Sequence, residues 1–197
     1  MSADLTGYPF NPATDNNSVE GAKVYVPFDG NRMTVFRVTT PFDSAATLFA
    51  HEEGVSVEMT SVNDATDVIT ITTPTFSNGD RVFVTGATIT GGLTEGDVYY
   101  VISVSGSNLQ LSLTSGGAAI DLTDTNTCVI YQLPASQNTG DMLLLKLEKS
   151  DGSDRTLTFK GGFNPDDGTK DALTASATHM YFVYDSTSGL YNRVKTS

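Results

Sequence analysis

The sequence predicts an all-β protein, and two observations carry this prediction. Val, Ile, Thr, Tyr and Phe recur with a period of two, which is typical of strands with one buried face. Gly, Asn, Asp and Ser interrupt these runs at the spacing of tight turns. The finer prediction is a jelly-roll-like β-sandwich into which a small β-module is inserted.

The predicted strands share an alternation of apolar and polar residues, and they are justified in chain order by the turns between them. Asp29-Gly30-Asn31, Asp151-Gly152-Ser153 and Ser186-Thr187-Ser188-Gly189 supply the positive φ or the side-chain hydrogen bonds that hairpins need. The predicted strands are 23–26, 33–39, 55–60, 68–72, 81–85, 98–104, 109–114, 127–132, 142–149, 155–160, 179–184 and 191–195.

One segment has a helix-like composition. Residues 44–53 read SAATLFAHEE, and Asp43 or Ser44 could cap one or two helical turns that Gly54 would end. An irregular strand is the alternative for this segment. It is the one place where the sequence suggests a helix.

The chain divides at two linker-like stretches. Residues 62–66 and 134–140 have the composition of linkers, and the flanking strands would form a continuous series without the segment between them. We therefore expect an extended arm over 1–19, a discontinuous β-sandwich domain over 20–61 and 132–197, and an inserted β-module over 62–131.

The amino-terminal segment is predicted to be an extended arm that binds a partner. Pro9 and Pro12 fix φ and remove backbone donors, which excludes a helix or a central strand. The arm either docks on its own domain or inserts Leu5, Tyr8 and Phe10 between neighbouring subunits. The second interpretation makes Leu5, Tyr8, Pro9, Phe10 and Pro12 the predicted partner-binding residues.

Composition excludes several classes of partner. The 197 residues include 23 acidic and 11 basic side chains, for a net charge of -12, and such a surface repels nucleic acid and anionic lipid. No apolar run approaches the roughly 20 residues that span a bilayer, and no export leader follows Met1. We expect synthesis in a cytoplasm. The single Cys128 lies in a strand pattern and is predicted to be a buried small hydrophobe.

Residues that could carry chemistry are few. His51 and His179 lack a third ligand at a metal-binding spacing, so no metal site or cofactor is expected. The acidic groups Asp151 with Asp154, and Asp166 with Asp167 and Asp171, are explained by turn formation more simply than by calcium binding. The sequence contains no nucleophile elbow and no phosphate-binding glycine loop. The prediction is that the chain is not an enzyme.

Residues 76–127 resemble a small β-module that recurs in structural proteins of tailed-phage particles. The residues that carry the resemblance are Tyr99, Tyr100 and Val101 after the turn Gly96-Asp97, and the turn 105–108 between strands 101–104 and 109–113.

A second resemblance lies in the later flank. Residues 143–147, the strand RTLTF at 155–159, the strand 180–185 and the following Gly189-Leu190-Tyr191 resemble the trimeric β-domains of phage fibre and head-decoration proteins. Tyr191 stands where that family often carries tryptophan. The resemblance implies a bacteriophage virion structural protein that associates as a homotrimer.

Three functions remain open at this stage. The first is a capsid decoration or cement protein that binds the major capsid protein on the capsid exterior and stabilises the shell. The second is a fibre or receptor-binding tip protein that recognises a host surface glycan, which predicts exposed tyrosines on the inserted module. The third is a carbohydrate-active hydrolase, which needs two carboxylates facing each other across a cleft.

Overall fold

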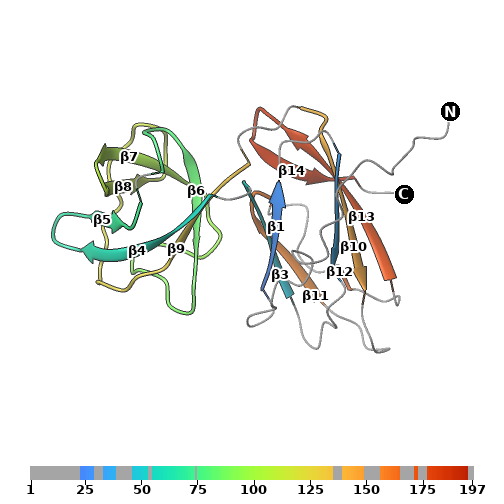
Figure 1. Cartoon of the computed structure of the whole chain (residues 1–197), viewed down its shortest axis with the longest axis horizontal. Helices are drawn as coiled ribbons and strands as arrows, with labels where there is room; N and C mark the ends of the chain where they lie inside the picture. Colours follow the sequence, from blue (N-terminus) through green and yellow to red (C-terminus); the bar gives the residue numbers. More distant parts are fainter. Residues whose placement is uncertain are drawn as a thin grey trace.

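The computed structural model describes residues 23–28, 33–38, 46–52, 55–73, 75–134, 139–148, 156–164, 171–172 and 177–194. All regular secondary structure in these ranges is β-strand, so the all-β prediction is confirmed (Figure 1). Each strand predicted from alternation is present, with ends that differ by a few residues. In chain order the strands are β1 (Lys23–Phe28), β2 (Met33–Val38), β3 (Ala46–Glu52), β4 (Ser56–Asn63), β5 (Val68–Ile71), β6 (Arg81–Thr85), β7 (Tyr99–Ser105), β8 (Asn108–Ser112), β9 (Val129–Gln132), β10 (Met142–Glu148), β11 (Thr156–Gly161), β12 (Asp171–Ala172), β13 (Ala177–Asp185) and β14 (Leu190–Arg193).

The chain winds between two four-stranded sheets. Sheet A has the order β1-β3-β11-β12, and sheet B has the order β14-β13-β10-β2. The chain passes from β1 in sheet A to β2 in sheet B and back to β3, and later from β10 in sheet B to β11 in sheet A. A strand that returns to its sheet after such a crossing can run parallel to its neighbour. Accordingly, β1 pairs with β3, β3 with β11 and β2 with β10 in parallel.

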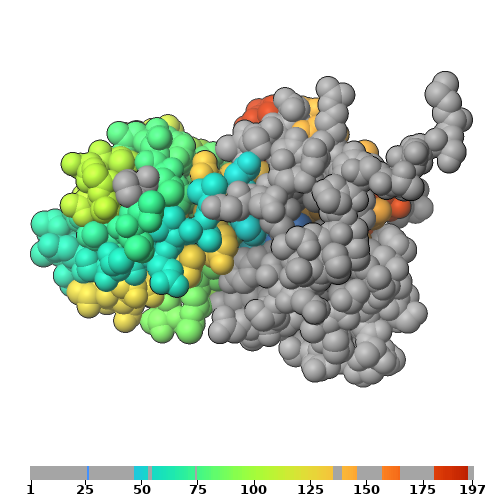
Figure 2. Space-filling view, viewed as in Figure 1, coloured from blue at the N-terminus to red at the C-terminus, as the bar shows by residue number. Residues whose placement is uncertain are grey.

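The strands from β4 to β9 close into a barrel with the order β4-β5-β8-β7-β6-β9. Strand β4 illustrates the pattern that builds it, because Val57 and Met59 are buried while Ser56, Glu58 and Thr60 are exposed. Closure leaves the barrel without an unpaired sheet edge. Figure 1 shows the barrel at one end of the molecule, with sheet A next to it, and the space-filling view in Figure 2 shows the barrel at the same end.

Strand pairing bears on where the barrel begins. Strand β4 pairs with β5 and β9, so residues 56–63 belong to the barrel by their hydrogen bonds. The predicted domain boundaries, at 61/62 and 131/132, remain predictions.

Sheets A and B face each other across one apolar core. Phe159, Phe163 and Phe182 form its aromatic centre, with ring centroids 4.8 to 5.3 Å apart. Rings at this separation and tilt interact favourably beyond their burial. The members of the core are Val26, Leu48, Ala50, Leu143, Leu145, Leu157, Phe159, Phe163, Met180, Phe182, Tyr184 and Tyr191.

The helix-like interpretation of residues 44–53 is wrong, because this segment contains strand β3. Leu48 and Ala50 face the core between the sheets, whereas Phe49 belongs to a second cluster with Phe83 of the barrel. Both faces of β3 are therefore buried. A strand buried on both faces has a continuous apolar run, which periodicity alone does not distinguish from a buried helix.

Candidate functional site

The partner-binding residues predicted in the arm, Leu5, Tyr8, Pro9, Phe10 and Pro12, lie outside the described residues. The acidic residues Asp151, Asp154, Asp166 and Asp167 also lie outside them. The functional geometry that can be described is the junction between the barrel and sheet A, together with the cavities beside it.

An aromatic column joins the barrel to the outer face of sheet A. Phe49 of β3 stacks on Phe83 of β6 with centroids 5.5 Å apart, and Phe83 stacks on Tyr131 of β9 at 5.4 Å. His51 of β3 meets the Tyr131 ring edge-on at 5.1 Å. Stacked and edge-on pairs at these distances add to the stability that burial alone provides. The column therefore fixes the barrel against sheet A.

His51 is held in its neutral form within this column. Burial lowers the pKa of His51 below its ordinary value of 6.5, because desolvation disfavours the imidazolium. The backbone hydrogen bond to Glu52 and the charge of Glu52 act in the opposite direction but are smaller. The ring Nδ1 lies 2.9 Å from the Glu52 carbonyl oxygen. A neutral, buried ring at this position acts as a packing element of the junction.

The backbone of β11 comes close to the barrel at Gly161. This residue has a φ of +63°, and a Cβ there would lie 2.9 Å from Cε1 of Phe83. Its amide donates to the Gly96 carbonyl oxygen at 3.0 Å, and Lys160 Nζ donates to the Glu95 carbonyl oxygen at 2.9 Å. Only glycine satisfies both the dihedral angle and the close approach.

The β13–β14 hairpin makes a second connection to the barrel. Arg81 of β6 reaches the hairpin so closely that a Cβ at Gly189 would overlap its Nη1 atom. Tyr184 of β13 donates its hydroxyl hydrogen to the Pro134 carbonyl oxygen at 2.9 Å. Aromatic packing, backbone hydrogen bonds and the hairpin contact together connect the barrel to both sheets.

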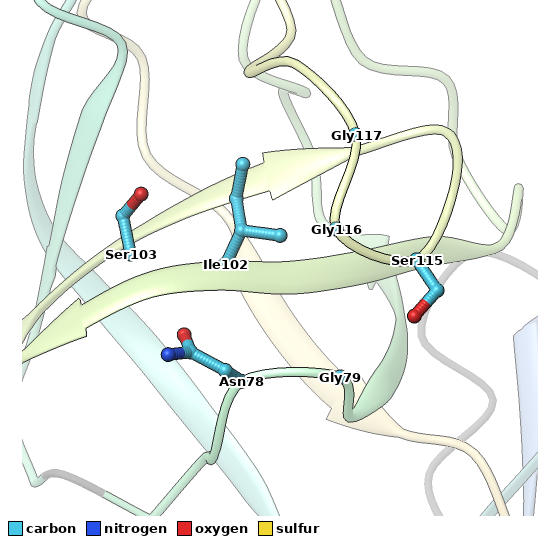
Figure 3. Close-up of a pocket in the computed structure, with 7 residues that line it drawn as sticks. All are labelled: Asn78, Gly79, Ile102, Ser103, Ser115, Gly116 and Gly117. Atoms are coloured by element: carbon cyan, nitrogen blue, oxygen red, sulfur yellow. The ribbon is translucent and has the colours of Figure 1, made fainter.

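A solvent-open hollow of about 380 Å³ lies on the barrel (Figure 3). Figure 3 shows Ile102 and Ser103 on β7 between two loops, one with Asn78 and Gly79 and the other with Ser115 to Gly117. None of these side chains is charged or aromatic. Asn78 Oδ1 accepts a hydrogen bond from the Val104 amide at 2.9 Å, so it stabilises the local backbone. The hollow offers small polar groups and one apolar side chain to a ligand.

The tyrosines of the barrel are not exposed platforms. Tyr99 is 2% exposed, and its hydroxyl accepts a hydrogen bond from the Thr94 amide at 2.7 Å. Tyr100 and Tyr131 are half-buried. The exposed tyrosines that a glycan-binding module would carry are therefore absent from residues 62–73 and 75–131.

Cys128 is buried in the barrel core, as predicted, with 6% of its surface exposed. Its Sγ lies 3.6 Å from both Thr90 Oγ1 and Met59 Sδ. Burial raises the pKa of the thiol, so the reactive thiolate is disfavoured.

The described part of the chain contains no cluster of three or more His, Cys, Asp or Glu residues that could hold a metal ion. Within the same part, no helix is long and apolar enough to cross a membrane. Three cavities contain one carboxylate each among their lining residues: Asp80, Asp97 or Asp121.

Sequence reasoning missed the junction residues Phe49, Phe83, Arg81 and Gly189. A signal for two of them was present, since LFA at 48–50 and VFV at 82–84 are unbroken apolar triplets. Such triplets indicate strands with two buried faces. The contact between Arg81 and Gly189 has no local signal.

In comparisons with known proteins, no family model, no curated protein and no solved structure matches this chain.

Proposed function

We propose that this chain is a bacteriophage virion structural protein, a decoration or cement protein that binds the outer capsid surface as a homotrimer and stabilises the shell. The observation that carries the proposal is the junction. Aromatic stacking of Phe49, Phe83 and Tyr131 holds the barrel and sheet A in a fixed arrangement, which a structural component of a particle requires. The net charge of -12 supports a position on the exterior, away from packaged nucleic acid.

The finer fold that accompanies this proposal is a jelly-roll-like β-sandwich. Two facing sheets with a shared core support the sandwich part of the description. The parallel pairs β1 with β3, β3 with β11 and β2 with β10 differ from the antiparallel pairing of an ordinary jelly roll. The proposed likeness to a jelly roll is therefore limited to the arrangement of two facing sheets and does not extend to the strand pairing.

The trimer is proposed to form through the outer face of sheet B. Leu143, Leu145, Met180 and Phe182 point into the core, so strand alternation directs their neighbours outward. Apolar side chains at these outward positions, with Val194 beyond β14, form a sheet B outer patch, defined as Met142, Leu144, Tyr181, Val183 and Val194. The same alternation directs Asp185 outward at the hairpin end of β13.

A second copy of the chain is the occupant that charge favours for this patch. The five members are uncharged, and in an acidic chain two copies repel least away from acidic groups, so the contact is expected at these residues and not at Asp185 at the hairpin end of the same face. By contrast, the exposed positions of β4 are Ser56, Glu58, Thr60, Ser61 and Asn63. The same chain thus uses polar residues where a strand faces water.

The alternative functions gain less support. A fibre or receptor-binding tip protein that recognises a host glycan could use the hollow of about 380 Å³, but that hollow lacks an aromatic platform. A carbohydrate-active hydrolase needs two carboxylates in one cleft. Three of the cavities have one carboxylate each among their lining residues, namely Asp80, Asp97 or Asp121.

The experiment that tests this proposal removes the amino-terminal arm. We propose that Leu5, Tyr8, Pro9, Phe10 and Pro12 contact the major capsid protein. Deletion of residues 1–12 should leave a folded trimer that no longer sediments with undecorated capsids of the phage that encodes it. The full chain is the control. Unchanged capsid binding by the truncated chain would overturn the proposed role of the arm.

A further inference from the structure

We infer that the cavity between the barrel and the β13–β14 hairpin binds a carboxylate group through Arg81. The cavity has a volume of about 190 Å³, and its lining includes Asp80, Arg81, Gln132, Tyr184, Ser186 and Gly189. This inference concerns the chain itself and does not rest on the proposed virion function.

The first step of the argument is the state of the Arg81 guanidinium. Arginine remains protonated in proteins and offers several N–H donors in a rigid plane. The Nε atom of Arg81 is buried and has no hydrogen-bond partner. A buried donor without an acceptor is costly, and more so when it belongs to a charged group. Because Nε itself is buried, an acceptor that enters the cavity would meet the Nη groups of the same guanidinium.

The second step is that the hairpin holds this guanidinium in place. Because a Cβ at Gly189 would overlap Nη1, the guanidinium lies directly against the hairpin backbone. Gly189 has a φ of +67°, so the absence of a side chain suits both the turn and the contact. Arg81 is thus fixed at the boundary between the barrel and sheet B.

The third step concerns the acidic groups nearby. Asp80 Oδ2 accepts a hydrogen bond from the Ser77 amide at 2.8 Å. The Asp185 carboxylate accepts from the amides of Thr187, at 2.9 Å, and Ser188, at 3.4 Å. Both carboxylates are thereby engaged by their own turns. Among the described residues, no carboxylate forms an ion pair with Arg81.

The fourth step is the choice of ligand. A carboxylate presents two acceptor oxygens in a plane and matches the donor geometry of a guanidinium. The Gln132 side chain lines the same cavity and can add a neutral donor, while the Tyr184 hydroxyl is committed to Pro134. The carboxylate can come from a small acid or from an Asp or Glu side chain of a partner. Either source would bridge the barrel and the hairpin.

The experiment titrates the full-length chain with sodium acetate and, separately, with an acetylated and amidated Gly-Asp-Gly peptide. Sodium chloride holds the ionic strength constant. Two signals are followed: the melting temperature and the NMR resonance of the Arg81 Nε–H group. At about ten times the Kd, the melting temperature should rise by roughly 3 to 6 °C, and the Nε–H resonance should shift as the ligand binds the neighbouring Nη groups.

Three variants make the result specific. Arg81→Lys keeps the charge but removes Nε and the planar donor pair, so both responses should disappear. Arg193→Lys is the matched control at another arginine and should retain both responses. Asp80→Asn removes the one carboxylate of the lining and should lower the Kd.

The outcomes separate the two sources. A response to acetate supports a free acid as ligand, and a response to the peptide alone supports a partner side chain. If the Arg81 Nε–H resonance and the melting temperature respond to neither probe, the cavity binds no carboxylate and the inference is overturned. An equal rise in the Arg81→Lys variant would overturn it too.

Discussion

The outer faces of sheets A and B both carry large apolar side chains, but these side chains have different surroundings. On sheet A, Phe49 is fully buried because the barrel covers it. On sheet B, Met142, Tyr181 and Val194 are 38%, 39% and 43% exposed. The comparison teaches that the outer face of a sheet in this chain is buried where another part of the same chain packs on it and stays partly exposed elsewhere. Sheet A is covered by the chain's own barrel, and we propose that sheet B is covered by other copies.

The strongest way to break the comparison is to remove the aromatic column from sheet A. Phe83→Ala deletes a buried ring that stacks on Phe49 and on Tyr131. The expected loss in the free energy of unfolding is about 3 to 5 kcal/mol, measured by urea denaturation. Leu113→Ala, at a side chain that is 70% exposed, is the control and should change stability by less than about 0.5 kcal/mol. Equal effects in the two variants would contradict the account of the junction.

A smaller effect is expected at the backbone contact. Gly161→Ala places a Cβ 2.9 Å from Phe83 Cε1 at a φ of +63°, so overlap adds to backbone strain. We expect a loss of about 2 to 3 kcal/mol. Gly106→Ala is a matched control, because Gly106 has a φ of +59° and nothing within 4 Å of the added atom. It should cost only about 1 kcal/mol. If Gly106→Ala is as destabilising as Gly161→Ala, the close approach contributes nothing.

The third prediction tests whether the outer face of sheet B is a site of self-association. Tyr181→Ser removes the exposed ring opposite Leu144. Because the ring is only 39% exposed and pairs with Leu144 across the sheet, the free energy of unfolding of the single chain should fall by about 1 kcal/mol. Self-association should weaken about tenfold or more, as sedimentation at several concentrations would measure. Ser56→Ala on the exposed face of β4 is the control. Unchanged association of Tyr181→Ser would exclude this face from the interface.

The smallest expected effect is a pH dependence from His51. Its pKa is lowered in the folded chain by burial, so the unfolded chain takes up a proton near its ordinary value of 6.5 before the folded chain does. The His51 contribution is therefore complete above pH 6.5 and decreases as the pH falls below it, by at most about 1.4 kcal/mol per pH unit.

Urea midpoints at pH 7.5 and 5.5 would measure this contribution. The His51→Gln variant should lose the dependence in this interval, whereas His179→Gln should retain it. An identical slope in wild type and His51→Gln would contradict the assignment.

Much of the strand content could be predicted from the sequence, because alternation is a local property. The residues Val57 and Met59 of β4 and the turn 186–189 carry their own signals. Parallel pairing and barrel closure could not be predicted, because they depend on strands far apart in the chain. The helix-like interpretation of 44–53 failed because burial of both faces of β3 erased the period of two. The carboxylate cavity depends on Arg81 meeting Gly189, a contact between distant residues that no local pattern encodes.

The central claim is that the chain works as self-associating structural material, with the sheet B outer patch covered by further copies. Analytical ultracentrifugation of the full-length chain at micromolar concentration tests this claim most directly. The account predicts a species of three times the chain mass of 20.9 kDa. A single species at the mass of one chain, unchanged across that concentration range, would contradict it.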